Sequence, residues 1–202
     1  MAVFAGCAKE ARNSKSAIEM TMELIKTPLN GLFLISAIRQ VDDRGEFVES
    51  WHHDRYRDCG IEDTFVQDNV SVSNPNVLRG LHFRHPEPQT QLVTVISGQI
   101  FDVCVDLRKN SKTFGRWHGV ELNGSKKDQL YMPAGFAHGY CVIGHDQAVV
   151  HYKCSRLFDA ESERGLLWND PEIGVEWPKG NWIISERDQT FPKLGNIEGI
   201  GP

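Results

Sequence analysis

Short segments rich in β-branched and aromatic residues alternate with turn residues along most of the chain, and this succession constrains the fold most strongly. The segments recur about every 8–12 residues, which is typical of β-sandwiches and β-barrels. Helical patterns are weak, apart from one helical turn expected near 53–58. The lack of strand–helix alternation and of a glycine-rich phosphate loop disfavours parallel nucleotide-binding folds. The expected strands are Leu32–Arg39, Arg44–Glu49, Phe65–Ser73, Gln91–Ser97, Gln99–Leu107, Trp117–Leu122, Gln129–Met132, Gly139–Ile143 and Ala148–Cys154.

Length and charge limit the classes of partner. The 202 residues suit one domain, with or without an appendage. A net charge of −5 argues against broad binding to nucleic acid or to anionic membranes. No apolar run is long enough to span a bilayer. We therefore expect no nucleic-acid or membrane partner, and any anionic ligand must be bound by a local arginine cluster.

The cysteines indicate the compartment. Their number, five, is odd, and no two have CxxC spacing, so neither a disulfide framework nor a zinc knuckle is indicated. Three of them lie in apolar strand-like runs, where a free cysteine behaves as a small hydrophobic residue. We expect reduced thiols and a cytoplasmic protein.

The two ends of the chain differ in character. Residues 1–20 fail as a signal peptide, because a basic leading region and a sufficiently long apolar segment are missing. We interpret them as an extension outside the fold, and 21–202 as a single domain. The segment from Phe158 to Pro202 holds three tryptophans and several prolines. Its aromatic content is too high for disorder, so irregular structure and short helices wrapped over the barrel are expected.

Titratable and cationic side chains interrupt the stretch from Val77 to Asp106, which otherwise resembles barrel core. Strands normally bury alternate residues and leave the others facing water. Here the polar residues recur at spacings that would point them into a cavity, so the barrel interior is a candidate reaction site. These residues are Arg79, His82, His85, Gln91 and Asp102.

The same stretch also has features of a metal site. PAGFAHG at 133–139 matches the second half of the cupin signature, whose histidine often binds a metal together with an HxH pair. The earlier element here is HxxH, formed by His82 and His85. Residues three apart on a strand point to opposite faces, and the neighbouring arginines disfavour a cation. We therefore expect no metal.

A set of motifs occurs in a fixed order along most of the chain. The motifs are RGLHF at 79–83, FDVCVDLR at 101–108, SKTFGRW at 111–117, YMPAGFAHGY at 131–140, HYKCS at 151–155, ERGLLWNDPEIGVEWP at 163–178 and ISERD at 184–188. Over about residues 22–195 the chain thereby resembles one family, the dTDP-4-dehydrorhamnose 3,5-epimerases. The resemblance implies an all-β, cupin-type jelly-roll barrel with a few short peripheral helices. It also implies a homodimer that needs no cofactor and acts on a nucleotide-diphosphate 4-keto sugar.

The reaction explains the catalytic residues that the resemblance implies. The C–H bonds at C3 and C5 of a 4-keto sugar are acidic, so epimerisation needs a base, an acid on the opposite face and a donor for the enolate oxygen. An imidazole suits proton abstraction near neutral pH. The resemblance assigns the base to His82, oriented by Asp188, and the acid to Tyr152. Tyr131 and Tyr140 are alternatives, expected in the same barrel layer.

The resemblance also implies a set of substrate-binding residues. Guanidinium groups bind phosphate oxygens with two hydrogen bonds, which an acidic protein needs locally. Phe47 and Glu49 share a strand face and would contact the nucleotide, across the dimer interface. The residues implied for the pyrophosphate are Arg44, Arg79 and Arg187, and those implied for sugar and phosphates are Gln67, Asn69 and His138.

Gln91 departs from the family pattern, which commonly has a lysine that helps to hold the sugar carbonyl oxygen. Gln91 offers only a neutral N–H group, and charge-assisted hydrogen bonds are about twice as strong as neutral ones. Lys153 follows Tyr152 directly, so on a regular strand it points to the opposite face and cannot substitute. His85 is a possible substitute.

The expected function is therefore epimerisation of a nucleotide-linked 4-keto-6-deoxy sugar, of the dTDP-4-dehydro-6-deoxyglucose 3,5-epimerase type. Because of Gln91, two alternatives stay open: a single-centre epimerase of a CDP- or GDP-linked 4-keto sugar, and a non-catalytic or metal-binding cupin. An isomerase that moves the ketone between C3 and C4 would use a similar pocket with different histidine spacing.

Overall fold

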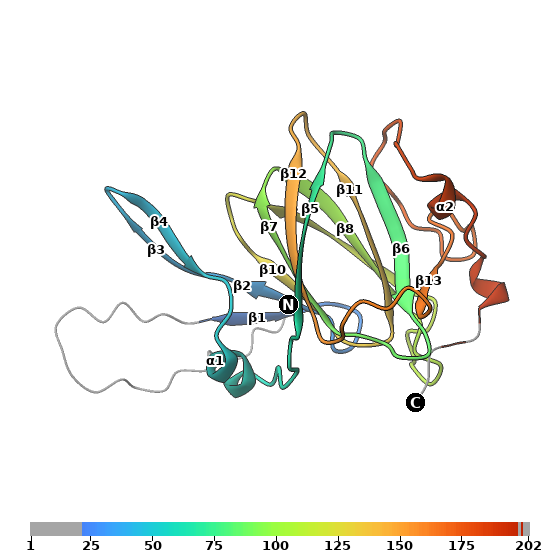
Figure 1. The fold of residues 1–202 in the computed structure, drawn as a ribbon, viewed down its shortest axis with the longest axis horizontal. Helices are drawn as coiled ribbons and strands as arrows, with labels where there is room; N and C mark the ends of the chain where they lie inside the picture. Colours follow the sequence, from blue (N-terminus) through green and yellow to red (C-terminus); the bar gives the residue numbers. More distant parts are fainter. Residues whose placement is uncertain (1–21, 198, 200–202) are drawn as a thin grey trace.

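Two antiparallel sheets face each other and enclose the barrel interior in the computed structural model, which describes residues 22–197 and 199 (Figure 1). The six-stranded sheet has the order β1-β2-β10-β7-β12-β5 and the five-stranded sheet the order β13-β6-β11-β8-β9. The strands of the first are β1 (Glu23–Lys26), β2 (Phe33–Ser36), β10 (Gln129–Met132), β7 (Gln91–Ser97), β12 (Ala148–Cys154) and β5 (Gln67–Ser73). Those of the second are β13 (Glu163–Gly165), β6 (Leu78–Arg84), β11 (Phe136–Val142), β8 (Gln99–Asp106) and β9 (Trp117–Asn123).

Alternation along the strands fills part of the barrel interior with apolar side chains. Val93 and Val95 of β7 share a cluster with Ile100 of β8 and Val142 of β11, all fully or nearly fully buried. Residues two apart on a strand share a face, so the same strands carry further inward-facing positions beyond this cluster. The polar residues of the pocket occupy those positions.

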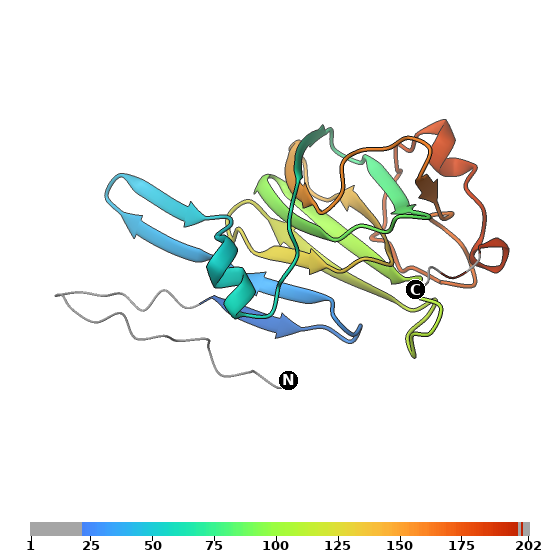
Figure 2. The ribbon, with the colours of Figure 1, turned by 60° about the horizontal axis from the view of Figure 1, so that its bottom comes forward.

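Two further apolar clusters cover the outer faces of the sheets. The segment after β12 lays Leu166, Ile173 and Leu194 over the five-stranded sheet, where they meet Leu81 and Val105. It contains the short helices α2 (Glu186–Gln189) and η1 (Leu194–Asn196), and Figure 2 shows it along one side of the barrel. The expectation that this segment wraps over the barrel is confirmed.

The strands β3 (Ile38–Asp42) and β4 (Gly45–Glu49) form a separate two-stranded hairpin. Both ribbon views show this hairpin projecting away from the two sheets (Figures 1 and 2). It leaves Phe47 68% exposed, an unusual state for a large aromatic side chain on a strand. The helix α1 (His53–Asp58) follows, at the residues where one helical turn was expected.

Most of the expected strands are present, with differences at identifiable places. The predicted strand 32–39 is divided into β2 and β3, because the chain leaves the six-stranded sheet there to form the hairpin. The strands β1, β6 and β13 were not among the predicted ranges. In β6, charged residues and a glycine interrupt the apolar alternation on which strand prediction depends. No helix in the described part of the chain is long and apolar enough to cross a membrane. The interpretation of residues 1–20 lies outside the described residues.

Candidate active site

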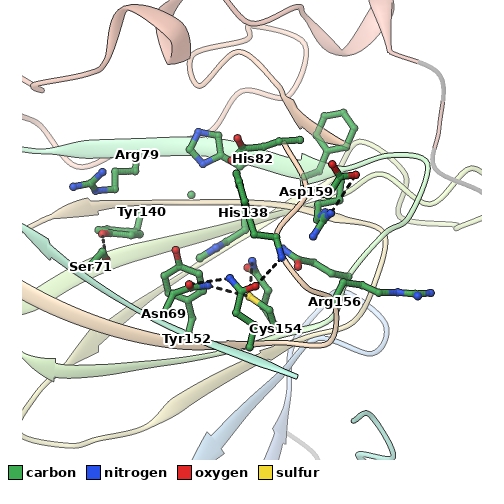
Figure 3. Close-up of a pocket in the computed structure, with 18 of the residues that line it drawn as sticks. Asn69, Ser71, Arg79, His82, His138, Tyr140, Tyr152, Cys154, Arg156 and Asp159 are labelled. Carbon is green, nitrogen blue, oxygen red and sulfur yellow. Dashed lines mark hydrogen bonds and ion pairs between the residues drawn. The ribbon is translucent and has the colours of Figure 1, made fainter. Parts of the chain in front are cut away.

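A cavity of about 380 Å³ opens between the two sheets, beside the apolar core (Figure 3). Its volume falls in the range of small-molecule sites. Both sheets contribute to its lining, as do the loop after β12 and the start of α2. The residues on the six-stranded sheet are Gln67, Asn69, Ser71, Gln91, Tyr152 and Cys154; those on the five-stranded sheet are Arg79, His82, Arg84, His138 and Tyr140, and Glu163 and Arg187 lie at the rim.

Strand alternation places the polar residues of β5 and β12 as predicted. Gln67 and Asn69 face the cavity together, and Gln67 Nε2 donates to Asn69 Oδ1 at 3.0 Å. Tyr152 also faces the cavity, whereas Lys153 Nζ bonds Asp68 Oδ1 at 2.7 Å outside it. The prediction that Lys153 points away from the face that carries Tyr152 is confirmed.

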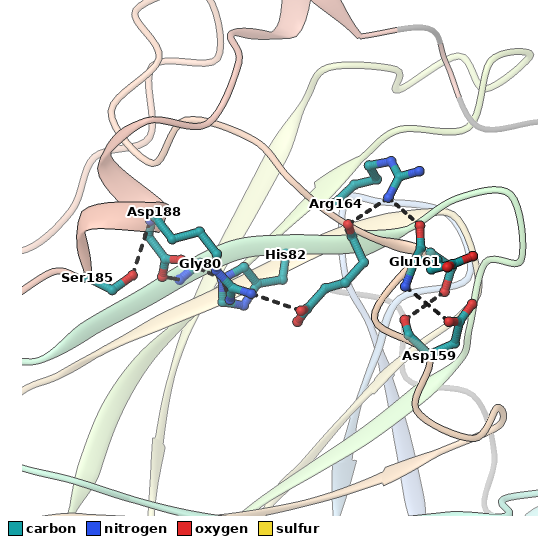
Figure 4. A network of polar contacts seen from close by, with 10 residues as sticks. Gly80, His82, Asp159, Glu161, Arg164, Ser185 and Asp188 are labelled. Atoms are coloured by element: carbon teal, nitrogen blue, oxygen red, sulfur yellow. Dashed lines mark hydrogen bonds and ion pairs between the residues drawn. The ribbon is translucent and has the colours of Figure 1, made fainter.

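His82 and Asp188, separated by 106 residues, form a hydrogen-bonded pair at the cavity wall (Figure 4). His82 Nε2 lies 2.9 Å from Asp188 Oδ1, and Asp188 is 3% exposed. Asp188 Oδ2 also accepts from the backbone N–H of Gly80 at 3.0 Å. Burial by itself raises the pKa of Asp188, but the hydrogen bonds from His82 and Gly80 outweigh it and lower the pKa to about 2. Asp188 is therefore a carboxylate at neutral pH.

Gly80 is required by the backbone that presents His82. Its φ of +118° is rarely adopted by residues with a side chain. A Cβ atom there would lie 2.6 Å from the Cα of Gly139 on β11. The close approach of β6 and β11 at this point directs the Gly80 N–H group to Asp188.

Tyr152 faces the same cavity from the opposite sheet (Figure 3). Burial raises the pKa of its phenol, so the group is protonated at neutral pH and can donate. Tyr140 also lines the cavity, and its hydroxyl lies 2.9 Å from the hydroxyls of Ser71 and Ser73. The expectation that Tyr131 shares this layer is wrong: its hydroxyl donates to Asp63 at 2.6 Å, and its ring packs in the outer cluster.

A second His–Asp pair lies on the five-stranded sheet. His138 Nε2 is 2.9 Å from Oδ2 of Asp102, a carboxylate with no exposed surface. His138 and His82 occupy paired positions on β11 and β6. The sequence singled out Asp102 without assigning it a role, and the structure shows that it orients the ring of His138.

Two arginines that were expected to bind phosphate line the cavity at different places. Arg79 Nε donates to Ser73 Oγ at 2.9 Å, whereas Arg187 donates to Glu163 Oε2 at 2.8 Å. The same Arg187 places its NH2 group 3.2 Å from His82 Nε2. Sequence reasoning missed Glu163, although the ERG motif that contains it was noted.

The side-chain amide of Gln91 makes few polar contacts in the described structure. Its Nε2 lies 4.0 Å from the thiol of Cys154, and its Oε1 is buried with no hydrogen-bond partner among the described residues. Arg84, which sequence reasoning also missed, lines the cavity and is only 8% exposed. Its position could have been found from the two-residue period that starts at His82.

Some of the predicted residues lie away from the cavity of their own chain. Arg44 and Phe47 lie on the hairpin, where Arg44 NH2 bonds Asp42 Oδ2 at 2.6 Å. Glu49, at the end of the same hairpin, forms an ion pair with Arg55. His85 is exposed beyond the end of β6, so the expectation that it can substitute for a lysine at 91 is wrong. Among the described residues, no group of three or more His, Cys, Asp or Glu side chains could hold a metal ion.

Comparisons with known proteins agree with the fold and identify a family. The family model described as dTDP-4-dehydrorhamnose 3,5-epimerase matches residues 26–196. The enzyme of that name from Methanothermobacter thermautotrophicus is 45% identical over 173 residues, 84% of this chain and 93% of the relative. A dTDP-4-dehydrorhamnose 3-epimerase from Streptomyces niveus is 37% identical over 182 residues, 89% of this chain and 87% of the relative.

A solved structure gives the same result. The crystal structure of dTDP-6-deoxy-D-glucose-3,5-epimerase from Legionella pneumophila, in complex with dTDP-4-keto-L-rhamnose, superposes with a TM-score of 0.84. It is 41% identical, and the match covers 88% of this chain and 95% of that chain. The expected all-β, cupin-type jelly-roll fold is confirmed.

Proposed function

The chain belongs to the dTDP-4-dehydrorhamnose 3,5-epimerase family and is an isomerase, and we propose that His82, Asp188 and Tyr152 carry out the epimerisation of its nucleotide-linked 4-keto-6-deoxy sugar. The observation that carries this proposal is the placement of a carboxylate-paired histidine and a protonated tyrosine on opposite walls of one cavity.

The proposed mechanism is a proton transfer across the sugar ring. His82 removes the proton from the carbon next to the C4 ketone, and Asp188 stabilises the imidazolium that forms. The electron pair moves to the carbonyl oxygen and gives an enolate. Tyr152 then delivers a proton to the opposite face of the same carbon, which inverts it. Since C3 and C5 both flank the ketone, one base and one acid can serve both centres.

The remaining cavity residues would bind the substrate. Arg79 and Arg187 are suited to the pyrophosphate, since guanidinium groups bind phosphate oxygens strongly. Gln67, Asn69 and His138 offer hydrogen-bond donors and acceptors to the sugar and phosphates. In this arrangement Asp102 positions His138 but does not touch the substrate.

We further propose a homodimer in which each hairpin contacts the nucleotide bound by the partner. This arrangement gives a role to Arg44, Phe47 and Glu49, which do not line the cavity of their own chain and lie on the hairpin that projects from the two sheets (Figure 1). The outer face of β5 also presents apolar side chains to solvent: Val70 is 64% exposed and Val72 lies beside it on the same face. Exposed apolar strand surface of this kind favours association.

The free thiols of the described cysteines support a cytoplasmic location.

Deuterium exchange tests the proposed reaction. The protein is incubated in D2O with dTDP-4-keto-6-deoxyglucose, and proton NMR follows the signals at C3 and C5. We expect deuterium at both carbons, together with inverted product. The proposal is contradicted if no deuterium enters the dTDP-linked sugar and none enters CDP- or GDP-linked 4-keto sugars tested in the same way.

A single-centre epimerase is the second candidate, favoured by the 37% identity to a dTDP-4-dehydrorhamnose 3-epimerase. In the same experiment it would exchange and invert C3 while leaving the C5 proton in place.

A further inference from the structure

We propose that the buried guanidinium of Arg84 supplies the positive charge that stabilises the enolate oxygen, in place of a cation at position 91. The inference deepens the proposed function and rests on it. It concerns a residue to which neither the reaction scheme nor substrate binding has so far given a role.

The reaction requires a strong donor at the C4 oxygen. When His82 takes the proton, the C–H electron pair becomes the C3–C4 or C4–C5 double bond, and the carbonyl oxygen gains a negative charge. A preorganised donor at this oxygen is commonly the largest single contribution to such catalysis. Gln91 is neutral, and its only N–H contact in the described structure is to the weak acceptor Cys154 Sγ. The amide alone is a poor counterpart for a full negative charge.

Strand geometry places Arg84 at the same end of the cavity as Gln91. Arg84 follows His82 by two residues on β6, so the two side chains share a face. On the opposite wall, Cys154 follows Tyr152 by two residues and pairs with Gln91 across the strands. The cavity therefore continues from the base and the acid to an end formed by Arg84, Gln91 and Cys154.

Electrostatics link the two walls at this end. Burial raises the pKa of the Cys154 thiol, and the charge of Arg84 acts in the opposite direction on the same group. A second, smaller recess is also lined by His82, Arg84 and Gln91 together. Both observations indicate that Arg84 and Gln91 lie close together at this end of the cavity.

The positive charge of Arg84 is only weakly compensated by its neighbours. Its Nε and NH2 donate to Ser162 Oγ, and its NH1 donates to the carbonyl of Leu157 at 2.5 Å. These three bonds to neutral acceptors use three of the five N–H groups of a guanidinium. The carboxylate of Asp159 lies 3.8 Å away and is 55% exposed, so it compensates the charge only weakly. A buried cation in this state is stabilised by an anion that forms in the cavity.

The other arginines of the cavity are less suited to this role. Arg187 is paired with Glu163 and Asp188, and Arg79 is bonded to Ser73 at the far end from Cys154 (Figure 3). Arg156 is more than half exposed. In the proposed step Arg84 stays protonated throughout: the charge on the oxygen forms beside it and disappears when Tyr152 reprotonates the carbon and the ketone returns.

Substitution of Arg84→Gln, combined with a rescue at position 91, tests the inference. The removal of one oxyanion donor typically lowers the rate about 10²- to 10³-fold. We expect R84Q to lower kcat for deuterium exchange by this factor with little change in KM, because the charge on oxygen develops only after binding. In the double variant R84Q/Q91K, the ammonium group returns a cation to the same end, and we expect kcat to rise at least about tenfold above that of R84Q.

The rescue separates this role from a structural one. Arg84 also anchors the loop through Leu157 and Ser162, and a lysine at 91 cannot restore those bonds. A folded R84Q with kcat within about threefold of the wild type overturns the inference, as does a double variant no faster than R84Q. Should R84Q fail to fold, R84K decides instead: exchange within about tenfold of the wild type supports the charge role, and a loss beyond about a hundredfold in folded protein overturns it. Absence of exchange in the wild type would contradict the proposed function instead.

Discussion

The cavity and the β3–β4 hairpin both contain residues that the resemblance assigns to the site. At the cavity the carboxylate is buried and fixed by hydrogen bonds, whereas the hairpin leaves side chains such as that of Arg44 exposed to solvent. In the cavity, Asp188 is 3% exposed and is fixed by His82 and by the Gly80 backbone. On the hairpin, the Arg44 side chain is 89% exposed and its ion partner is Asp42 of the same turn. Exposed ion pairs of this kind contribute little to stability.

This difference indicates which functions one chain completes alone. The base and its carboxylate are oriented by contacts within the described chain, so the proposed proton transfer needs no other subunit. The hairpin has no such contacts with the cavity, and its large apolar side chain Phe47 faces solvent. The chemistry is therefore placed in the barrel, and in the proposed homodimer the hairpin would contact a nucleotide bound by the second copy.

The largest expected effect comes from His82→Asn. General acid–base catalysis commonly contributes up to about 10⁴-fold, so we expect exchange at C3 and C5 to fall by about that factor. Asn can still donate to Asp188, and the thermal unfolding temperature should therefore stay close to that of the wild type. If folded H82N keeps more than a tenth of the wild-type exchange rate, His82 is not the base, and the contrast between a catalytic cavity and a non-catalytic hairpin fails.

Tyr152→Phe should separate exchange from inversion. Without the phenol, His82 can still remove a proton and return deuterium to the same face, so we expect exchange to continue while the inverted product falls about 10²- to 10³-fold. The matched control is Tyr140→Phe, which removes a hydroxyl from the same cavity and should change inversion less than about tenfold. The opposite pattern would assign the acid to Tyr140. Since burial raises the pKa of Tyr152, the alkaline loss of wild-type activity should lie above pH 10.

Period-two alternation predicted much of the cavity, because it depends only on strand geometry. It put Gln67 and Asn69 on one face and Lys153 on the other, as the structure has them. It failed for Tyr131, since all four residues of β10 are buried and burial on both faces removes the alternating signal.

Longer-range features were beyond such local patterns. The approach of Asp188 to His82 depends on the path of the whole C-terminal segment, and only the family resemblance indicated it. Arg84 was missed because a charged residue at a strand end is ordinarily solvated, whereas here Ser162 and Leu157 bury it. Glu163 lies on β13, a three-residue strand too short to give a period.

Acid sensitivity should distinguish Asp188 from the hairpin carboxylate Asp42. The folded-state pKa of Asp188 is lowered to about 2 from 3.8, so the pair stabilises the fold above about pH 4 and this contribution is lost as the pH falls through 2. The shift corresponds to about 2 kcal/mol. Denaturant unfolding should show D188N less stable by about this amount at neutral pH, with the difference vanishing between pH 4 and pH 2. Arg44 also lowers the pKa of Asp42, but this ion pair is exposed to solvent, so Asp42→Asn should change the pH profile of stability only slightly. A profile altered equally by both variants would contradict the distinction.

The smallest effect is expected on the hairpin, from Phe47→Ala. Loss of an aromatic contact to the nucleotide should raise KM about tenfold, equivalent to about 1.4 kcal/mol, with kcat for exchange unchanged. Mixing subunits then shows which cavity the hairpin serves. In a heterodimer of F47A and H82N chains, the intact hairpin of the H82N chain would reach the F47A chain, whose His82 is intact.

Co-expression of these two chains with different tags allows the heterodimer to be purified. We expect it to show wild-type KM at half the wild-type kcat, although H82N alone is inactive and F47A alone binds weakly. If the heterodimer keeps the raised KM of F47A, the hairpin acts within its own chain or not at all. The separation between a barrel that catalyses and a hairpin that serves the partner would then fail.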